Sequence, residues 1–310
     1  MKVLITGGSG FLGSHITDFL LKRGDSVVVI DNFETGRRDN LKPHVNLNVV
    51  EGTIANDELL DSLFVKYSVD FVIHAAASYK NPENWTEDAK SNILGTINIV
   101  KCCLKHNVKR IVYFQTALCY GTKPLEQPIT LNHPILPEGS SYSISKTTGE
   151  QYIHLSGLDY VTFRLANVYG PRNISGPLPV FYSRLTADKP CFVMDTRRDF
   201  VYVDDLVKVV IKAVDGVGHG TYHVSSGSDI SIKEMFDATT SALDMGTIDV
   251  EVRPRLADDA PSILLEPGKT NETFDWQTET SLVNGVRKAV EYYREYGIKE
   301  TFTHLHFVEE

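Results

Sequence analysis

The chain has 310 residues, of which 42% are hydrophobic and 23% charged, and a net charge of −9. This composition is ordinary for a soluble globular enzyme, and the negative charge argues against nucleic acid or an anionic membrane as the partner. Because the sequence has neither an apolar run of about 18 residues nor a signal-peptide pattern, we expect a cytoplasmic protein. The four cysteines lack metal-ligand spacing and two are adjacent (Cys102 and Cys103), so we expect no disulfide framework.

The first half of the chain alternates short apolar runs with segments of helical spacing. Strands are predicted at 2–6, 26–30, 47–52, 70–76 and 110–116, and helices at 11–24, 57–66 and 92–106. Such alternation is typical of an α/β protein with a doubly wound parallel sheet. After residue 166 prolines interrupt the rhythm and the elements become shorter. We predict two domains, 1–165 and mainly 166–310, with the chain returning to the sheet near 196–225 and ending in an amphipathic docking helix at 281–296.

The segment TGGSGFLG (6–13) follows the first predicted strand and opens the first helix. Its glycines, Gly7, Gly10 and Gly13, are spaced for a tight turn, for close approach to a pyrophosphate and for helix–strand packing. Asp31 ends the second strand, where a carboxylate can accept the ribose hydroxyls and repel a 2′-phosphate. The pattern therefore favours NAD, although two arginines on the next loop, Arg37 and Arg38, leave NADP open.

A Tyr-x-x-x-Lys motif, Tyr142 to Lys146, lies in YSISK. On a helix, residues i and i+4 share a face, and a nearby ammonium lowers the pKa of a phenol. Tyr142 is therefore a candidate acid/base, and Lys146 can bind ribose hydroxyls. The motif alone is weak because many surface helices carry such pairs. It becomes specific beside the glycine-rich loop and the predicted strand that ends in Thr116.

In this combination the chain resembles the extended short-chain dehydrogenase/reductase family of NAD-dependent nucleotide-sugar epimerases and dehydratases. The resemblance covers nearly the whole length and is carried by TGGSGFLG, DNFETGRRDNL (31–41), NILGT (92–96), YSISK, RLANVYGPRN (164–173), RRDFVYVDDL (197–206) and ETFDW (272–276). It implies a Rossmann domain for NAD and a C-terminal domain for a nucleoside diphosphate sugar. It also implies a homodimer, formed through the helix near 92–106 and the helix that starts near Tyr142.

The resemblance further implies the residues of the site. The implied catalytic residues are Tyr142, Lys146 and Thr116. The implied cofactor contacts are Gly7, Gly10, Phe11, Leu12, Gly13, Asp31, Asn32, Ile54, Ala75, Ala76, Ala77, Asn92, Tyr142 and Lys146. The implied substrate contacts are Tyr79, Gln115, Thr116, Asn167, Arg198 and Arg255, the last from an Arg-x-x-Asp motif with Asp258. We expect no metal, because the tail histidines His304 and His306 lack an evident third ligand.

The residues after Thr116 discriminate among the reactions of the family. Dehydratases typically carry Asp and Glu there, and decarboxylases keep the Glu, whereas this chain has Ala117 and Leu118. Neither side chain can carry a proton, which favours an epimerase, by analogy one that acts on a UDP-hexose at C4. A reductase, a dehydratase with displaced acids and a non-catalytic NAD-binding regulator remain open. Gln115 stands where relatives usually have Ser, so we expect it to read a different sugar substituent.

Four other residues near these motifs also have predicted roles. His74 ends a predicted strand and is interpreted as structural. Strand alternation should turn Cys119 into the core. Thr53 replaces an Asp that relatives often place at the adenine, and Lys80 could pair with a sugar carboxylate or remain solvated.

Overall fold

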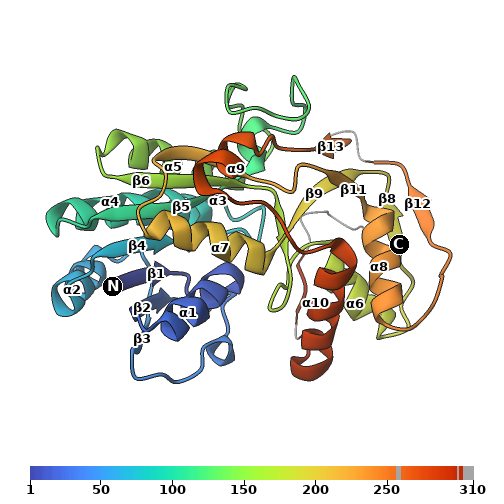
Figure 1. The fold of residues 1–310 in the computed structure, drawn as a ribbon, viewed down its shortest axis with the longest axis horizontal. Coiled ribbons are helices and arrows are strands. Elements are labelled where there is room, and N and C mark those ends of the chain that lie inside the picture. Colours follow the sequence, from blue (N-terminus) through green and yellow to red (C-terminus); the bar gives the residue numbers. More distant parts are fainter. Residues whose placement is uncertain (256–259, 299, 303–310) are drawn as a thin grey trace.

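A seven-stranded, entirely parallel sheet forms the centre of the larger part of the molecule (Figure 1). The computed structural model describes residues 1–255, 260–298 and 300–302. The spatial order is β10-β6-β5-β4-β1-β2-β3. The strands are β1 (Lys2–Thr6), β2 (Ser26–Asp31), β3 (Leu47–Glu51), β4 (Phe71–His74), β5 (Arg110–Thr116), β6 (Tyr160–Leu165) and β10 (Gly220–Val224). The predicted α/β class and doubly wound sheet are confirmed.

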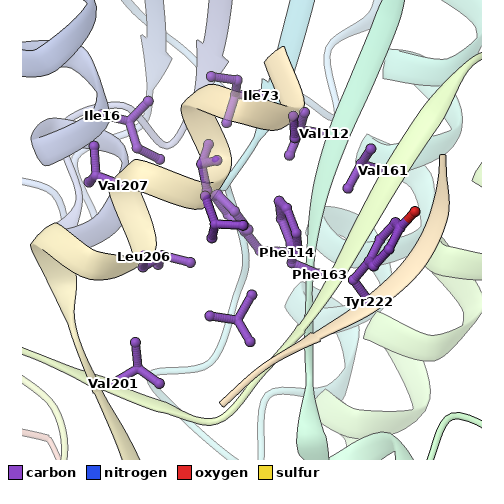
Figure 2. Close-up of a cluster of buried hydrophobic side chains, with 14 of the residues drawn as sticks. Ile16, Ile73, Val112, Phe114, Val161, Phe163, Val201, Leu206, Val207 and Tyr222 are labelled. Atoms are coloured by element: carbon purple, nitrogen blue, oxygen red, sulfur yellow. The ribbon is translucent and has the colours of Figure 1, made fainter. Parts of the chain in front are cut away.

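Helices cover both faces of this sheet, which is why its central strands are apolar runs rather than alternating ones. On one face lie α2 (Asp57–Tyr67), α4 (Thr96–Lys105) and α5 (Ser141–Leu155). The other face is covered by α1 (Phe11–Arg23) and α7 (Val203–Val214). Figure 2 shows Ile16 of α1 and Val207 of α7 near Ile73 and Val112 of the sheet, with Phe114 next to them.

A smaller layer with its own core lies beside the sheet, on the right of Figure 1. Four short strands form one small sheet: β7 (Asn167–Tyr169), β9 (Arg197–Tyr202), β11 (Asp229–Ser231) and β13 (Ser262–Ile263). Two more, β8 (Phe192–Met194) and β12 (Glu251–Arg253), pair with each other. Three helices enclose the core: α6 (Pro177–Leu185), α8 (Ile232–Ala242) and α10 (Leu282–Tyr296). Helix α10 buries Val286, Val290 and Tyr293, so the predicted docking helix is confirmed.

The chain crosses back to the large sheet after its first excursion. Helix α7 and strand β10 both follow residue 166, yet they belong to the sheet layer, and α9 (Gly268–Phe274) packs beside β10. Phe274 and Trp276 join the core under α7. We propose a domain division near residue 165 with these later elements assigned to the first domain.

The remaining elements are short and surround the edge where the parallel strands end. They are 3₁₀ turns at Arg38–Asn40 (η1) and Ala117–Tyr120 (η3), helix α3 (Trp85–Asp88) and a π-helical segment at Ala89–Gly95 (η2) that runs into α4. All four cysteines are free, and Cys102, Cys103 and Cys119 are buried, as expected without disulfides. His304 and His306 lie outside the described residues.

The described residues lack two kinds of feature. No three His, Cys, Asp or Glu side chains in the described ranges are grouped to hold a metal ion. No helix within those ranges has the length and apolar character needed to span a membrane.

Candidate active site

A cavity of about 1850 Å³ opens at the carboxyl edge of the parallel sheet, between the sheet and the smaller layer. The strand order reverses between β1 and β4, and ligands of open α/β sheets bind outside such a switch point. The cavity is bordered by the ends of five neighbouring strands with the segments that follow them, and by the smaller layer. Its lining residues fall mainly within 7–13, 30–35, 75–80, 114–118, 165–169, 177–184 and 189–200. One cavity thus borders both the predicted cofactor residues and the predicted substrate residues.

The structure brings most of the predicted site residues to this wall. Of the cofactor residues, Gly7, Gly10, Phe11, Leu12, Gly13, Asp31, Asn32, Ile54, Ala75, Ala76, Ala77, Tyr142 and Lys146 line it. Of the substrate residues, Tyr79, Gln115, Thr116, Asn167 and Arg198 line it. Asn92 and Arg255 are not on the wall.

The glycine-rich loop has no space for side chains. A Cβ at Gly7, whose φ is +65°, would lie 2.8 Å from the backbone of Ala76, and one at Gly13 would lie 2.3 Å from the carbonyl oxygen of Gly7. Helix α1 begins directly after the loop, with no acidic residue in its first turn. Its N-terminal N–H groups can therefore face a pyrophosphate without competition from a neighbouring carboxylate. A dinucleotide fits this part of the cavity.

Asp31 is held rigidly at the end of β2. Its Oδ2 accepts the backbone N–H of Ser9 and its Oδ1 that of Phe33, each at 2.8 Å. Burial raises the pKa of this carboxyl, and the backbone hydrogen bonds oppose the rise. Each carboxylate oxygen keeps a further lone pair for a ribose hydroxyl. Arg37 and Arg38 pair with acids instead, Arg37 with Asp39 and Arg38 with Glu51 at 2.5 Å.

Thr116, Tyr142 and Lys146 all line this cavity. Thr116 ends β5, and its Oγ1 accepts the backbone N–H of Leu118 at 3.2 Å, which caps the η3 turn. Tyr142 lies in the first turn of α5, its ring centroid 6.4 Å from that of Tyr79. The Lys146 ammonium lies 4.0 Å from the ring centroid of Tyr113. The predicted trio is therefore assembled from one strand end and one helix.

Electrostatics in this trio differ from the sequence-based expectation for Tyr142. Burial raises the pKa of Tyr142 above its ordinary value, and Tyr79 and Asp88 act in the same direction, so the predicted lowering is wrong for this state. Burial also lowers the pKa of Lys146 to about 7, against the opposing charge of Glu150. A lysine that is only partly charged near neutral pH, with its ammonium over another ring, does little to stabilise the phenolate.

Asn92 and His74 hold the wall from behind. The Asn92 amide donates to Ser145 Oγ of α5 and to the carbonyl of Ser78, both at 3.0 Å, and accepts the Ser78 N–H at 2.9 Å. It thereby joins the loop after β4 to the helix of the Tyr-x-x-x-Lys motif, and a direct cofactor contact by Asn92 stays a prediction. His74 is fully buried between the hydroxyls of Thr6 and Thr96, as a structural histidine should be.

The predicted substrate side of the cavity differs from the prediction in one arginine. The wall contains Arg198 of β9 and Arg253 of β12, but not Arg255. Arg253 stacks over the Phe192 ring at 3.9 Å, and β12 pairs with β8 at this point. The Arg-x-x-Asp motif pointed to Arg255. The pairing of β8 with β12, which puts Arg253 opposite Met194, cannot be read from the local sequence.

Sequence reasoning also missed two basic residues and gave the wrong reason for the burial of Cys119. Arg184 and Lys189, near the end of α6, line the wall and had no motif to mark them. Lys80 also lines the wall: its side chain is 35% exposed, pairs with Glu300 at 3.3 Å and lies over the Phe302 ring, and a contact with a sugar carboxylate stays a prediction. Cys119 is buried as expected, but it lies in the η3 turn and not in a strand, so the alternation argument was wrong.

Three comparisons with known proteins agree with this geometry. A model of the NAD dependent epimerase/dehydratase family matches residues 3–224. A putative UDP-glucose 4-epimerase of Methanocaldococcus jannaschii is 31% identical, with 94% of this chain and 97% of that protein covered.

Two solved structures from Bordetella bronchiseptica are also similar. The enzyme WbmH in complex with NAD⁺ is 54% identical, with a TM-score of 0.93 over 96% of this chain and 99% of that one. The enzyme WbmG in complex with NAD and UDP is 41% identical, with a TM-score of 0.91 over 99% of both chains. The family match spans the glycine loop, Asp31, Thr116 and the Tyr-x-x-x-Lys motif that line the cavity. The chain is a member of the NAD dependent epimerase/dehydratase family of enzymes.

Proposed function

We propose that the protein is an NAD-dependent epimerase that acts on a UDP-sugar, by default a UDP-hexose at C4, through a transient keto-sugar. One observation carries the proposal: Thr116, Tyr142 and Lys146 share a cavity with the dinucleotide loop, while the η3 turn after Thr116 supplies only Ala117 and Leu118. The site can move a proton on and off a hydroxyl, but at these two positions it has no group that could eliminate water.

The chain's residues divide the work as follows. NAD, when bound, supplies the hydride acceptor and then the hydride donor. Tyr142 takes the proton of the reacting hydroxyl and returns it, Thr116 hydrogen-bonds the same oxygen, and Lys146 binds ribose hydroxyls of the cofactor. Arg198 and Arg253 are placed to bind a diphosphate, which guanidinium groups contact in a bidentate manner. These roles are proposals supported by position on one cavity wall.

The nature of the nucleotide is supported by relatives. WbmG is known in complex with UDP, and the M. jannaschii relative is described as a putative UDP-glucose 4-epimerase. The competing dehydratase or decarboxylase reading requires proton carriers at other positions than 117 and 118. If the protein were a non-catalytic NAD-binding regulator, the buried Lys146 would be unexplained, because a regulator does not need an acid/base pair that costs stability to bury.

The proposed reaction returns the cofactor unchanged in each cycle. Incubation with a panel of UDP-, GDP-, CDP- and dTDP-sugars should give, for one UDP-sugar, its epimer as the sole product by NMR. Absorbance at 340 nm should show no sustained rise, because the hydride goes back to the same sugar. Stoichiometric NADH release would identify a dehydrogenase instead, and a product that has lost water or CO₂ would identify one of the other reactions.

Tyr142→Phe should abolish turnover and leave binding nearly intact. Phenylalanine keeps the ring that packs beside Tyr79 and loses only the proton, so the change belongs in kcat. General acid–base catalysis is worth about 10²–10⁴-fold, and a loss of at least this size is expected in steady-state kinetics. Tyr79→Phe is the matched control and should cost much less. Near wild-type turnover by Tyr142→Phe would mean that another group carries the proton.

Burying Lys146 should lower the stability of the folded protein. Its pKa in the folded protein is about 7, below its ordinary 10.5. Between these pH values the unfolded chain binds more protons, so stability rises with pH there. The penalty for burying the ammonium is therefore complete below about pH 7 and fades toward pH 10.5.

Lys146→Met should consequently inactivate the enzyme and raise its free energy of unfolding. At about 1.4 kcal/mol per pKa unit, we expect a gain of a few kcal/mol at pH 6 and a smaller gain at pH 9, from urea denaturation of cofactor-free protein. The exposed Lys22→Met is the control and should change stability little at either pH. A gain that does not depend on pH would contradict the buried-charge explanation.

We also propose a homodimer through α4 and α5. Large apolar side chains are exposed on these helices and the π-helical segment before α4: Leu94, Leu104, Ile144, Tyr152 and Leu155. The two helices are in contact, so these side chains can form one surface that a second copy would cover.

Light scattering at micromolar concentration should give a dimer mass for the wild-type protein. Leu104→Glu, which puts a charge on the proposed interface, should shift the mass toward the monomer. Val65→Glu is the matched control, since Val65 is also exposed but belongs to α2, which is not one of the two helices of the proposed interface. A wild-type monomer, or equal effects of the two variants, would count against this interface.

A further inference from the structure

Gln115 is not available to read a sugar substituent in the way expected from the sequence. It is 2% exposed, and both ends of its amide bind within the protein. Its Oε1 accepts the backbone N–H of Thr116 at 2.8 Å, and its Nε2 donates to Glu150 Oε2 at 3.1 Å. The amide is therefore a bridge between the end of β5 and helix α5.

Glu150 is a fixed anchor for this bridge. It lies on α5, one helical turn after Lys146 and two turns after Tyr142, and its side chain is 3% exposed. Arg164 donates to both of its oxygens, Nε to Oε1 at 3.1 Å and Nη2 to Oε2 at 3.2 Å. A carboxylate held in this bidentate way has little freedom to follow a displaced partner.

The anchor is itself fixed to the sheet. Gln115 and Arg164 are register partners on the adjacent strands β5 and β6. Arg164 Nη1 also donates to the Tyr120 hydroxyl at 2.7 Å, and that hydroxyl pairs with His223 Nε2 on β10 at 2.6 Å. Three strands and α5 are thus joined by one buried polar network behind the catalytic residues.

We propose that Gln115 is a positioning residue, which ties the Thr116 end of β5 to Glu150 on α5 and so sets the distance between the Thr116 and Tyr142 hydroxyls. The part concerned with turnover rests on the proposed function. The geometric part does not, because it concerns only the relation of β5 to α5. A catalytic geometry that changes by about 1 Å can lose on the order of 10²-fold in rate.

The test uses Gln115→Met, which keeps an unbranched side chain of similar length and removes both hydrogen bonds. Crystal structures of wild-type and variant holoenzyme give the distance between the Thr116 and Tyr142 hydroxyl oxygens. We expect it to change by more than about 0.5 Å, the tolerance typical of a functional site. Gln115→Asn, one methylene shorter, serves as a second variant if the first fails to fold, and should behave in the same way.

Kinetics supply an independent readout. Each Gln115 variant should lower kcat by at least about tenfold, with KM changed less than threefold and the order of preference across the UDP-sugar panel unchanged. Thr162→Val is the matched control. Thr162 is fully buried on β6 and its hydroxyl has no hydrogen-bond partner among the described residues, so its loss should leave kcat and the hydroxyl distance unchanged.

An unchanged hydroxyl distance in the Gln115 variants would overturn the proposal. So would an unchanged kcat accompanied by a new substrate preference, because this would restore Gln115 as a specificity residue. If the wild-type protein converts no UDP-sugar, the proposed function fails, and the crystallographic distance still decides the role of Gln115.

Discussion

Seven parallel strands end at one edge of the sheet, and this constraint fixes where every other part of the site can be. The loop after β1, the carboxylate of Asp31 and the hydroxyl of Thr116 are far apart in sequence, but each follows or ends a strand of the same sheet. Parallel pairing therefore brings them to one cavity, where Asp31 also accepts the backbone N–H of Ser9 in the loop after β1. The smaller layer has only to close the open side of that cavity.

Local patterns predicted the parts of the site that depend on local backbone geometry. The glycine loop is such a part, because a side chain at Gly7 or Gly13 would collide with nearby backbone. The i, i+4 spacing of Tyr142 and Lys146 is another, since it needs only the helix that contains it. The strand and helix pattern of the first half was correct for the same reason.

The parts that were missed depend on partners distant in sequence. Arg253 lies at the cavity because β12 pairs with β8, and Gln115 donates a hydrogen bond to Glu150, which is 35 residues away in the sequence. The pKa of Tyr142 was predicted from its lysine neighbour alone, whereas burial dominates it in the folded protein. A five-residue motif does not reveal which distant strands pair or how deeply a side chain is buried.

The Glu150–Arg164 pair shows how the core accommodates charge below the site. Burying two ions costs several kcal/mol per ion, and the cost is offset only when hydrogen bonds fill the remaining positions. Here Gln115 and Tyr120 provide them. An apolar replacement of similar volume could be as stable, but it would not define the relative position of β5 and α5 so narrowly.

The cap that Thr116 forms on the η3 turn has a consequence for the direction of its hydrogen bonding. The bond from the Leu118 N–H uses a lone pair of Oγ1 and leaves the hydroxyl hydrogen available. Thr116 can therefore donate to a sugar oxygen, and that oxygen accepts such a bond both as an alcohol and as a ketone. In the proposed reaction, the threonine would hold the sugar through both hydride transfers without changing its own protonation, and the mobile proton would travel through Tyr142.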